Sequence, residues 1–178
     1  MSRAVLSIGS NMGDRLELLA SVREHVAEHL VAVSAVFSTP PWGPVAQDDF
    51  DNAVLVVDDP DRSPVDWLET GFALERAAQR SRETRWGPRT LDVDLVTASI
   101  DGQVAVSDDP VLTLPHPRAH LRAFVLIPWL DADPGATLRT PDGDRPVTEL
   151  VDALDPAERD GVRRRDVEQW STTARGVS

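Results

Sequence analysis

The stretch LDVDLVT, residues 91–97, decides the fold, because its first five residues alternate apolar and acidic side chains as a half-buried strand does. Alternate residues of a strand share one face. The apolar side chains at 91, 93 and 95 are therefore expected to pack inward, while Asp92 and Asp94 project together on the opposite face. This one segment predicts both a core strand and a pair of neighbouring carboxylates.

Working outward, the chain alternates strand and helix patterns around this segment. Apolar spacing predicts strands over residues 3–9, 31–37 and 53–57, and helices over about 14–30 and from Pro64. Three prolines and a glycine in TPPWGP, residues 39–44, predict turns there. The order β-α-β-β-α-β predicts an α+β fold with a ferredoxin-like core, in which both helices cover one face of an antiparallel sheet.

The remainder of the chain is expected to surround that core. An additional hairpin and helices are predicted after Ile100, with a tight turn at Asp101-Gly102. Beyond residue 155 the chain is charged and poor in apolar residues, which predicts a solvated helix or a disordered tail. We expect residues 1–178 to form a single domain, with its core at about 3–135 and a charged tail at 155–178.

Composition limits the chemistry. The sequence has no cysteine, which excludes disulfides and thiolate nucleophiles. All 18 basic residues are arginines, so a Walker A phosphate loop and a Schiff-base mechanism, both of which need lysine, are excluded. If the protein handles phosphate, arginine and metal must provide the positive charge.

The net charge of −12 argues against a nucleic-acid partner. Between Arg76 and Arg89, however, five arginines stand against one acid, Glu83, which indicates a small polyanionic ligand or, alternatively, a solvated helix end. No apolar run is long enough to cross a membrane and the N-terminus lacks a signal pattern, so a cytoplasmic protein without a membrane partner is expected.

The carboxylate pair predicts a metal site. Two close carboxylates repel each other unless a cation lies between them, and Mg²⁺ commonly takes one or two protein carboxylates. The alternative is that Asp92 and Asp94 are merely the wet face of an edge strand. With Arg85 and Arg89 immediately upstream, a metal and arginine clamp for polyphosphate is favoured, which predicts a Mg²⁺-dependent enzyme that handles ATP.

The sequence resembles the 6-hydroxymethyl-7,8-dihydropterin pyrophosphokinases of folate biosynthesis over about residues 3–135. The most specific match is RWGPRTLDVD at 85–94. Further matches follow the family's order: GSN at 9–11, TPPWGP at 39–44, FDNA at 50–53, LPH at 114–116 and RAF at 122–124.

The resemblance implies transfer of the β,γ-pyrophosphoryl unit of ATP to the hydroxymethyl oxygen of the pterin, which leaves AMP. It implies two Mg²⁺ ions held by Asp92 and Asp94. The residues implied in catalysis are Arg80, Arg82, Arg89, Asp92 and Asp94. Those implied around ATP are Glu75, Arg82, Trp86, Arg89, Leu95, Thr113, His116 and Arg122. The implied partners are these two small molecules, and a monomer is expected.

The resemblance also implies the pterin contacts. Phe50 and Phe124 are expected to sandwich the ring. The residues expected at its edge are Thr39, Pro40, Trp42 and Asn52. Arg80 and Arg82 are implied on a loop that closes over the site, with Trp86 sealing it.

Four positions depart from the family pattern. Gln79 stands where a glycine usually precedes the loop arginines, and the loop is one residue shorter. Phe50 replaces a tyrosine, which keeps the stacking face. Val111 occupies a position that can carry an arginine, and Pro117 one that can carry an aromatic residue, so ATP affinity is expected to differ.

Two rival functions are consistent with parts of the pattern. A nucleotidyltransferase also uses Gly-Ser and D-x-D, but there the two motifs lie close in sequence, whereas about eighty residues separate Gly9-Ser10 from Asp92 here. A non-catalytic small-molecule sensor would share the fold without needing a carboxylate pair beside arginines. The pairs His25/His29 and His116/His120 have zinc-like spacing, but of these we expect only His116 at the site.

Overall fold

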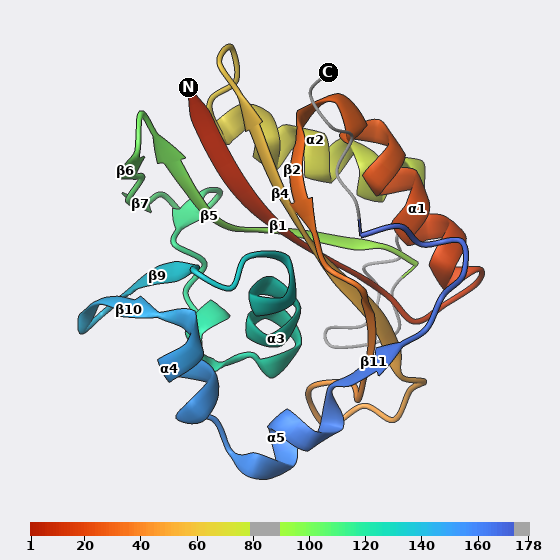
Figure 1. Ribbon diagram of the computed structural model, residues 1–178. Helices are drawn as coiled ribbons and strands as arrows, with labels where there is room; N and C mark the ends of the chain where they lie inside the picture. Colours follow the sequence, from red (N-terminus) through yellow and green to blue (C-terminus); the bar gives the residue numbers. More distant parts are fainter. Residues whose placement is uncertain (79–89, 173–178) are drawn as a thin grey trace.

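Strand β1 (Ser2–Ser10) lies at the centre of an antiparallel sheet in the computed structural model, which describes residues 1–78 and 90–172 (Figure 1). Among the described residues the sheet has seven strands in the order β11-β3-β4-β1-β5-β6, with β2 also pairing β4. The other strands are β2 (Leu30–Val33), β3 (Val36–Thr39), β4 (Phe50–Asp59), β5 (Asp92–Ile100), β6 (Gln103–Val104) and β11 (Arg163–Arg165). The prediction of an α+β fold around an antiparallel sheet is confirmed.

Helices cover both faces of this sheet (Figure 1). On one face, α1 (Arg15–His25) and α2 (Pro64–Ala77) pack against alternate residues of β1 such as Leu6, with Trp67 of α2 fully buried. On the other face, α3 (Ala123–Ala132) packs against the intervening residues, such as Val5. The sheet is therefore buried from both sides, which agrees with the nearly continuous burial along β1 and β4.

The predicted helix starts are confirmed by their caps. The Asp14 side chain accepts a hydrogen bond from the Glu17 amide at the start of α1. At α2, Ser63 and Asp66 form a reciprocal capping box ahead of Pro64. Each cap satisfies amide groups that the first helical turn leaves without intrahelical partners.

The predicted single strand at 31–37 is wrong, because the structure divides it into β2 and β3 around Ser34 and Ala35. The Ser34 hydroxyl accepts the Val54 amide at 2.9 Å, while the Ser34 amide donates to the Val54 carbonyl. The side chain thus replaces a backbone acceptor, which interrupts the regular ladder.

The predicted hairpin and helices after Ile100 are confirmed. Asp101 and Gly102 both have positive φ, 49° and 80°, in the turn between β5 and β6, as a tight primed turn requires. The elements that follow are β7 (Ser107–Asp108), β8 (Thr113–Leu114), the 3₁₀ turn η2 (Ala119–Leu121), the hairpin of β9 (Thr137–Thr140) and β10 (Gly143–Pro146), and α4 (Val147–Asp152).

The prediction of a solvated helix or a disordered tail holds for only part of residues 156–172, whose helix has no buried residue but whose strand joins the sheet. They form α5 (Pro156–Gly161) and β11, which pairs with β3 at the edge of the sheet. Trp170 then packs against the core and donates from Nε1 to the Ser34 carbonyl at 2.8 Å. Composition missed this because the charges of the segment find carboxylates on the body of the protein.

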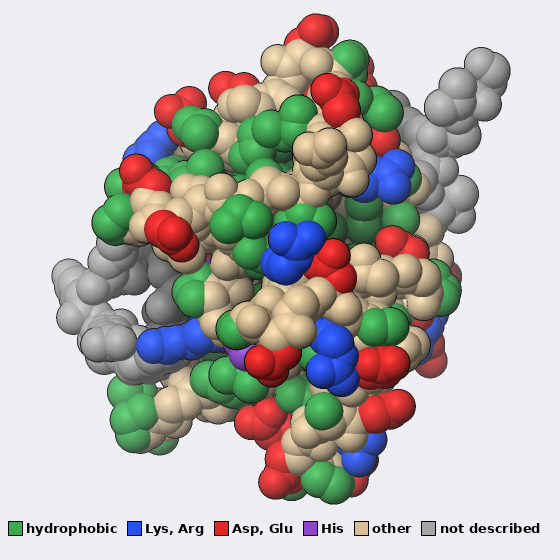
Figure 2. Space-filling model, turned by 90° about the vertical axis from the view of Figure 1, so that its left-hand side faces the viewer, with side chains coloured by type: hydrophobic (Ala, Val, Ile, Leu, Met, Phe, Trp, Pro, Cys, Tyr) green, Lys and Arg blue, Asp and Glu red, His purple; other side chains and the backbone are tan. Residues whose placement is uncertain are grey.

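None of the described helices is long and apolar enough to cross a membrane. On the face in Figure 2, the acidic and basic side chains are interspersed with apolar ones and do not gather into a basic field.

Candidate active site

The carboxylate pair lies where three strands end side by side. In the register of the sheet, Asp92 of β5 faces Gly9 of β1, and Gly9 faces Asn52 of β4. Asp94 faces Ser7, two residues along the same face. Antiparallel pairing thus brings together motifs that lie about 40 residues apart along the chain, on the face of the sheet where α3 begins.

A first cavity of about 310 Å³ opens at this point. It is lined by all six residues predicted to contact the pterin, together with both carboxylates and the predicted His116 and Arg122. The full lining is Ser7, Ile8, Gly9, Thr39, Pro40, Trp42, Phe50, Asn52, Asp92, Asp94, His116, Arg118, Arg122 and Phe124.

A second cavity of about 260 Å³ lies on the other side of the carboxylates. Four of the residues predicted around ATP line it: Glu75, Leu95, Thr113 and His116. Asp92, Asp94 and His116 line both cavities. The carboxylates therefore stand at the junction of two adjoining spaces, where groups bound in each would meet.

Sequence reasoning missed four lining residues of the first cavity: Ser7, Ile8, Gly9 and Arg118. A signal existed for Ser7 and Gly9, because the predicted strand order places β1 beside the carboxylate strand, and its period of two puts both residues on the carboxylate face. Arg118 had no signal beyond its closeness to the LPH motif.

Gly9 allows a close approach at the base of the first cavity. A Cβ atom at this position would lie 2.5 Å from Asn52 Oδ1, closer than real Cβ atoms come. Asn52 Nδ2 in turn donates to Thr39 Oγ1 at 2.5 Å, and both side chains are buried. The Asn52 amide is therefore fixed between a glycine backbone and a hydroxyl, ready to present its polar edge to a ligand.

Arg122 connects the aromatic wall of the first cavity with the carboxylates. Its guanidinium lies 5.7 Å from the ring centre of Trp42 and 5.5 Å from that of Phe124, within range of cation–π attraction. These two rings meet edge to face at 6.4 Å. Arg122 Nη1 also lies 3.7 Å from Asp94 Oδ2. Although predicted around ATP, Arg122 lines the first cavity and not the second, so an anion bound beside Asp94 would lie near this mostly buried cation.

His116 is held neutral at the junction. Its pKa is lowered to about 4, chiefly because burial disfavours the charged ring and also because the positive charge of Arg122 lies nearby, while Asp92 opposes the shift. The Arg118 amide donates to His116 Nδ1 at 3.2 Å. Because Nδ1 accepts, the neutral ring carries its proton on Nε2, which makes it a hydrogen-bond donor.

Glu75 has a structural contact beside the second cavity. Its Oε1 accepts the Val93 amide at 2.9 Å, and the side chain is buried between α2 and β5. This bond fixes the residue between Asp92 and Asp94. The predicted contact of Glu75 with ATP stays a prediction.

The described residues contain no cluster of three or more histidine and carboxylate side chains that could hold a metal alone. Asp92 and Asp94 supply hard oxygen donors and line both cavities. Mg²⁺ takes one or two carboxylates and fills its other positions with water and phosphate oxygens, so this donor set fits it. The predicted Arg80, Arg82, Trp86 and Arg89 lie outside the described residues.

The chain is similar to proteins of one family over most of its length. Residues 5–134 match the model of the 7,8-dihydro-6-hydroxymethylpterin-pyrophosphokinase family. A 2-amino-4-hydroxy-6-hydroxymethyldihydropteridine pyrophosphokinase of Mycobacterium tuberculosis is 51% identical over 168 residues, covering 92% of this chain and 89% of the relative. The protein of that name in Mycobacterium leprae is 46% identical, covering 100% of this chain and 98% of the relative.

The fold also resembles a Plasmodium falciparum HPPK-DHPS crystal structure with pteroate. The TM-score is 0.61 at 12% identity, and the match covers 92% of this chain. It covers 46% of the Plasmodium chain, so the present chain spans about half the length of that protein.

Proposed function

The chain belongs to the 7,8-dihydro-6-hydroxymethylpterin-pyrophosphokinase family, and from that premise we propose how its residues transfer pyrophosphate from ATP to the hydroxymethyl group of 6-hydroxymethyl-7,8-dihydropterin in folate biosynthesis. One observation carries the proposal: two cavities meet at Asp92, Asp94 and His116. A reaction between two bound substrates requires their reacting atoms to be brought together at such a junction.

We assign the first cavity to the pterin. Its walls combine the aromatic rings of Phe50, Trp42 and Phe124 with the amide of Asn52. A flat heterocycle with many donors and acceptors suits aromatic faces and an amide edge. The hydroxymethyl group then points toward the carboxylates, and the Thr39 hydroxyl keeps the Asn52 amide in one orientation.

We assign the second cavity to ATP. Leu95, Thr113 and His116 line it, and the neutral His116 offers its Nε2 proton to a phosphate oxygen. Arg122 lines the first cavity 3.7 Å from Asp94, which lines both, and from there its charge would stabilise the negative charge that develops on the phosphates. Glu75 acts here by fixing the strand that carries the carboxylates.

Asp92 and Asp94 would hold Mg²⁺, and two ions are the expected number. When bound, the metal would supply charge neutralisation and a template for the phosphates and the substrate alcohol. The hydroxymethyl oxygen attacks the β-phosphorus, the bond to the α-phosphate oxygen breaks, AMP leaves and the hydroxyl proton is released. Arg80, Arg82 and Arg89 are proposed to contact the phosphates, with Trp86 closing the site, on the strength of the sequence motif alone.

Three further proposals concern the protein as a whole. The strand order of β1, β4 and β5 supports a ferredoxin-like description of the core. We propose a single domain that works as a monomer. We also propose a cytoplasmic location, where ATP is available.

The test is an assay of the purified protein with Mg-ATP and 6-hydroxymethyl-7,8-dihydropterin, with the nucleotide products resolved. Pterin-dependent AMP is expected. ADP instead would indicate an ordinary kinase, pyrophosphate would indicate a nucleotidyltransferase, and either result would refute the proposed reaction. Omitting Mg²⁺ should abolish AMP formation, and unchanged activity without divalent cation would refute the metal assignment.

A further inference from the structure

The segment after residue 155 lies outside the part of the chain that matches the family, residues 5–134, yet it contacts the wall of the first cavity. Its strand β11 pairs with β3, whose last residue, Thr39, lines that cavity. The edge of the sheet at the pterin side is thus formed by the C-terminal segment.

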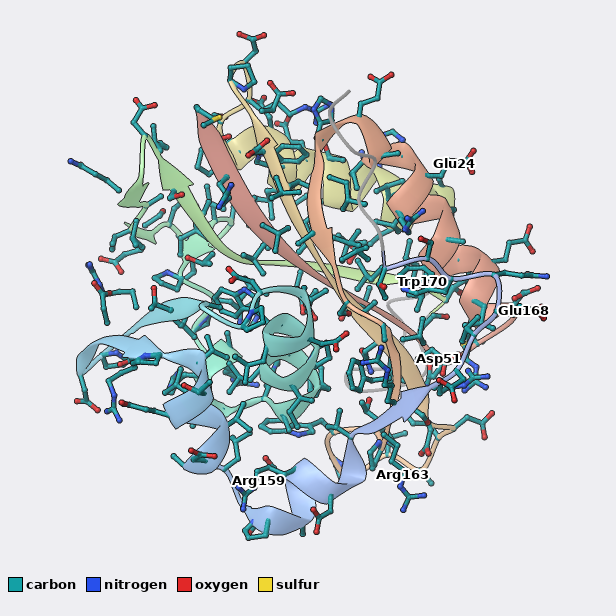
Figure 3. The ribbon with its side chains drawn as sticks, in the orientation of Figure 1. Glu24, Asp51, Arg159, Arg163, Glu168 and Trp170 are labelled. Carbon is teal, nitrogen blue, oxygen red and sulfur yellow. The ribbon has the colours of Figure 1, made fainter. Side chains whose placement is uncertain are left out.

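Arg164 and Arg165 of β11 form ion pairs on opposite faces of the sheet, because neighbouring residues of a strand point to opposite sides. Arg164 Nη1 lies 2.7 Å from Asp131 Oδ1 of α3. Arg165 Nη1 lies 2.5 Å from Asp51 Oδ2 of β4 on the face that carries α1. Figure 3 shows Asp51 beside the chain that leaves β11, while Arg163 projects away from it.

The ion pair between Arg165 and Asp51 is the most consequential of these contacts. The Asp51 side chain is 1% exposed, and it stands between Phe50 and Asn52, which both line the first cavity. Arg15 Nε lies 3.6 Å from the same carboxylate oxygen, and the other oxygen, Oδ1, has no hydrogen-bond partner among the described residues. A carboxylate so deeply buried depends on its paired cations, because removing Arg165 leaves its charge compensated only by the more distant Arg15.

A second contact reaches the cavity independently. Gly161, the last residue of α5, packs so closely on Pro40 that an added Cβ would lie 3.3 Å from two carbons of its ring. Pro40 lines the first cavity next to Trp42. The C-terminal segment therefore supports the cavity wall at two places, one by charge and one by packing.

We propose that residues 156–172 are a positioning element for pterin binding, acting through Arg165 on Asp51 and through Gly161 on Pro40. The inference rests on the proposed assignment of the first cavity to the pterin. Arg165 neutralises Asp51, which keeps β4 in the register and orientation that aim Phe50 and Asn52 into the cavity. The side chains of Arg164, Arg165 and Trp170 bond to Asp131, Asp51 and Ser34, none of which lines the second cavity, so we expect ATP binding to change little.

The test compares Arg165→Met with Arg163→Met, an exposed arginine of the same strand, in AMP formation with each substrate varied in turn. Arg165→Met should raise the KM for the pterin by roughly tenfold, as expected when a buried charge loses its partner, with the KM for ATP within about twofold of the wild type. Arg163→Met should leave both unchanged. Arg165→Lys should bring the KM for the pterin part of the way back to the wild-type value. Arg165→Met combined with Asp51→Asn should do the same, because the double variant also removes the carboxylate charge that Arg165 neutralises.

A second variant keeps the proposal testable if Arg165→Met fails to fold. Gly161→Ala adds one methyl group against Pro40 without a buried charge and should raise the pterin KM about threefold, a small packing effect. An unchanged pterin KM in Gly161→Ala and in every folded Arg165 variant, or equal effects on both substrates, overturns the inference alone. A wild-type protein that forms no pterin-dependent AMP overturns the proposed function together with it.

Discussion

The two cavities that meet at Asp92 and Asp94 are built differently. The first takes most of its walls from strands β1, β3, β4 and β5 and from the start of α3, so its strand residues are held by ladder hydrogen bonds. The second is formed by α2, by residues 92–95 of β5 and by residues 110–117, a connecting segment that contains only the two-residue strand β8. Val111 on that side is 69% exposed. One cavity is part of the sheet, and the other is bounded largely by a surface segment.

This difference agrees with where the sequence departs from the family pattern. Val111 and Pro117 both line the second cavity. The one departure in the first cavity, Phe50, keeps the aromatic face. In a sheet a displaced side chain disturbs its cross-strand neighbours, whereas surface segments tolerate change. Pterin recognition should therefore respond sharply to small substitutions in the sheet, and ATP recognition should be more tolerant.

The largest effect is expected from a substitution of Asp94, because this residue lines both cavities. Asp94→Ala should lower kcat by at least about 1,000-fold, because removing a metal ligand removes transition-state charge stabilisation of at least about 4 kcal/mol. The fold should persist, since the Asp94 side chain is 29% exposed and its ion pair with Arg122 is a long one, at 3.7 Å. AMP formation measures kcat, and thermal unfolding measures the stability of the fold.

The matched control is Asp58→Ala, a carboxylate of the same sheet that pairs with Arg3 at the surface. It should leave kcat unchanged. Near-normal turnover in Asp94→Ala would exclude this residue as a metal ligand, and an equal loss in Asp58→Ala would point to general destabilisation.

A sharper test of the sheet-built cavity is Gly9→Ala. The new Cβ would lie 2.5 Å from Asn52 Oδ1, so the Asn52 amide must move. Overpacking of this kind costs about 1–3 kcal/mol, and we expect the pterin KM to rise roughly 10- to 100-fold at that cost. The ATP KM should change little, because Gly9 does not line the second cavity.

Gly135→Ala controls for the loss of a glycine, because its nearest neighbour would be 3.6 Å from the added Cβ. It should behave as the wild type. If Gly9→Ala raised the KM for ATP as much as that for the pterin, the division between the two cavities would be wrong.

The sequence predicted those features that follow from local patterns. Alternation in 91–95 placed Asp92 and Asp94 on one face, and spacing around Asp14 and Pro64 located the helix starts. The six predicted pterin residues line one cavity because their motifs flank strand ends that the topology brings together. Their contacts with a ligand stay predictions, as do the roles of Arg80, Arg82 and Arg89.

Tertiary partners explain what local patterns missed. Composition predicts a solvated helix or a disordered tail because it does not reveal the ion pairs of this segment. Arg164 pairs with Asp131, and Arg165 pairs with Asp51. The break at Ser34 depends on a hydroxyl that replaces a backbone acceptor on β4. The need for glycine at position 9 arises from a side chain 43 residues away. Each depends on contacts between distant segments, which no period in the sequence encodes.

His116 lines both cavities, and its lowered pKa predicts how the free energy of unfolding changes with pH. Its pKa is lowered to about 4 in the folded protein from an ordinary 6.5, so the unfolded chain alone binds a proton between these values. Stability contributed by neutral His116 is therefore present above pH 6.5 and lost as the pH falls toward 4. One proton changes the unfolding free energy by at most about 1.4 kcal/mol per pH unit, and partial exposure keeps the change smaller.

The measurement compares denaturant unfolding of the wild type and His116→Gln from pH 7.5 to 4.5 without divalent cations. The wild type should lose stability relative to the variant as the pH falls below 6.5. A difference that stays constant with pH, or that moves in the wild type's favour, would contradict a lowered pKa.

The smallest effect is expected from the hydroxyl that holds the Asn52 amide. Thr39→Val keeps the shape of the side chain but removes the acceptor 2.5 Å from Asn52 Nδ2, which leaves a buried donor without its partner. Such a loss costs about 1–3 kcal/mol of stability, and we expect the pterin KM to rise only about three- to fivefold, because Gly9 still confines the amide. Thr39→Ser retains the hydroxyl and should restore the wild-type KM. If Thr39→Val kept the wild-type KM while Thr39→Ser raised it, the methyl group and not the hydrogen bond would orient the amide, and the pterin cavity would owe its shape to packing alone.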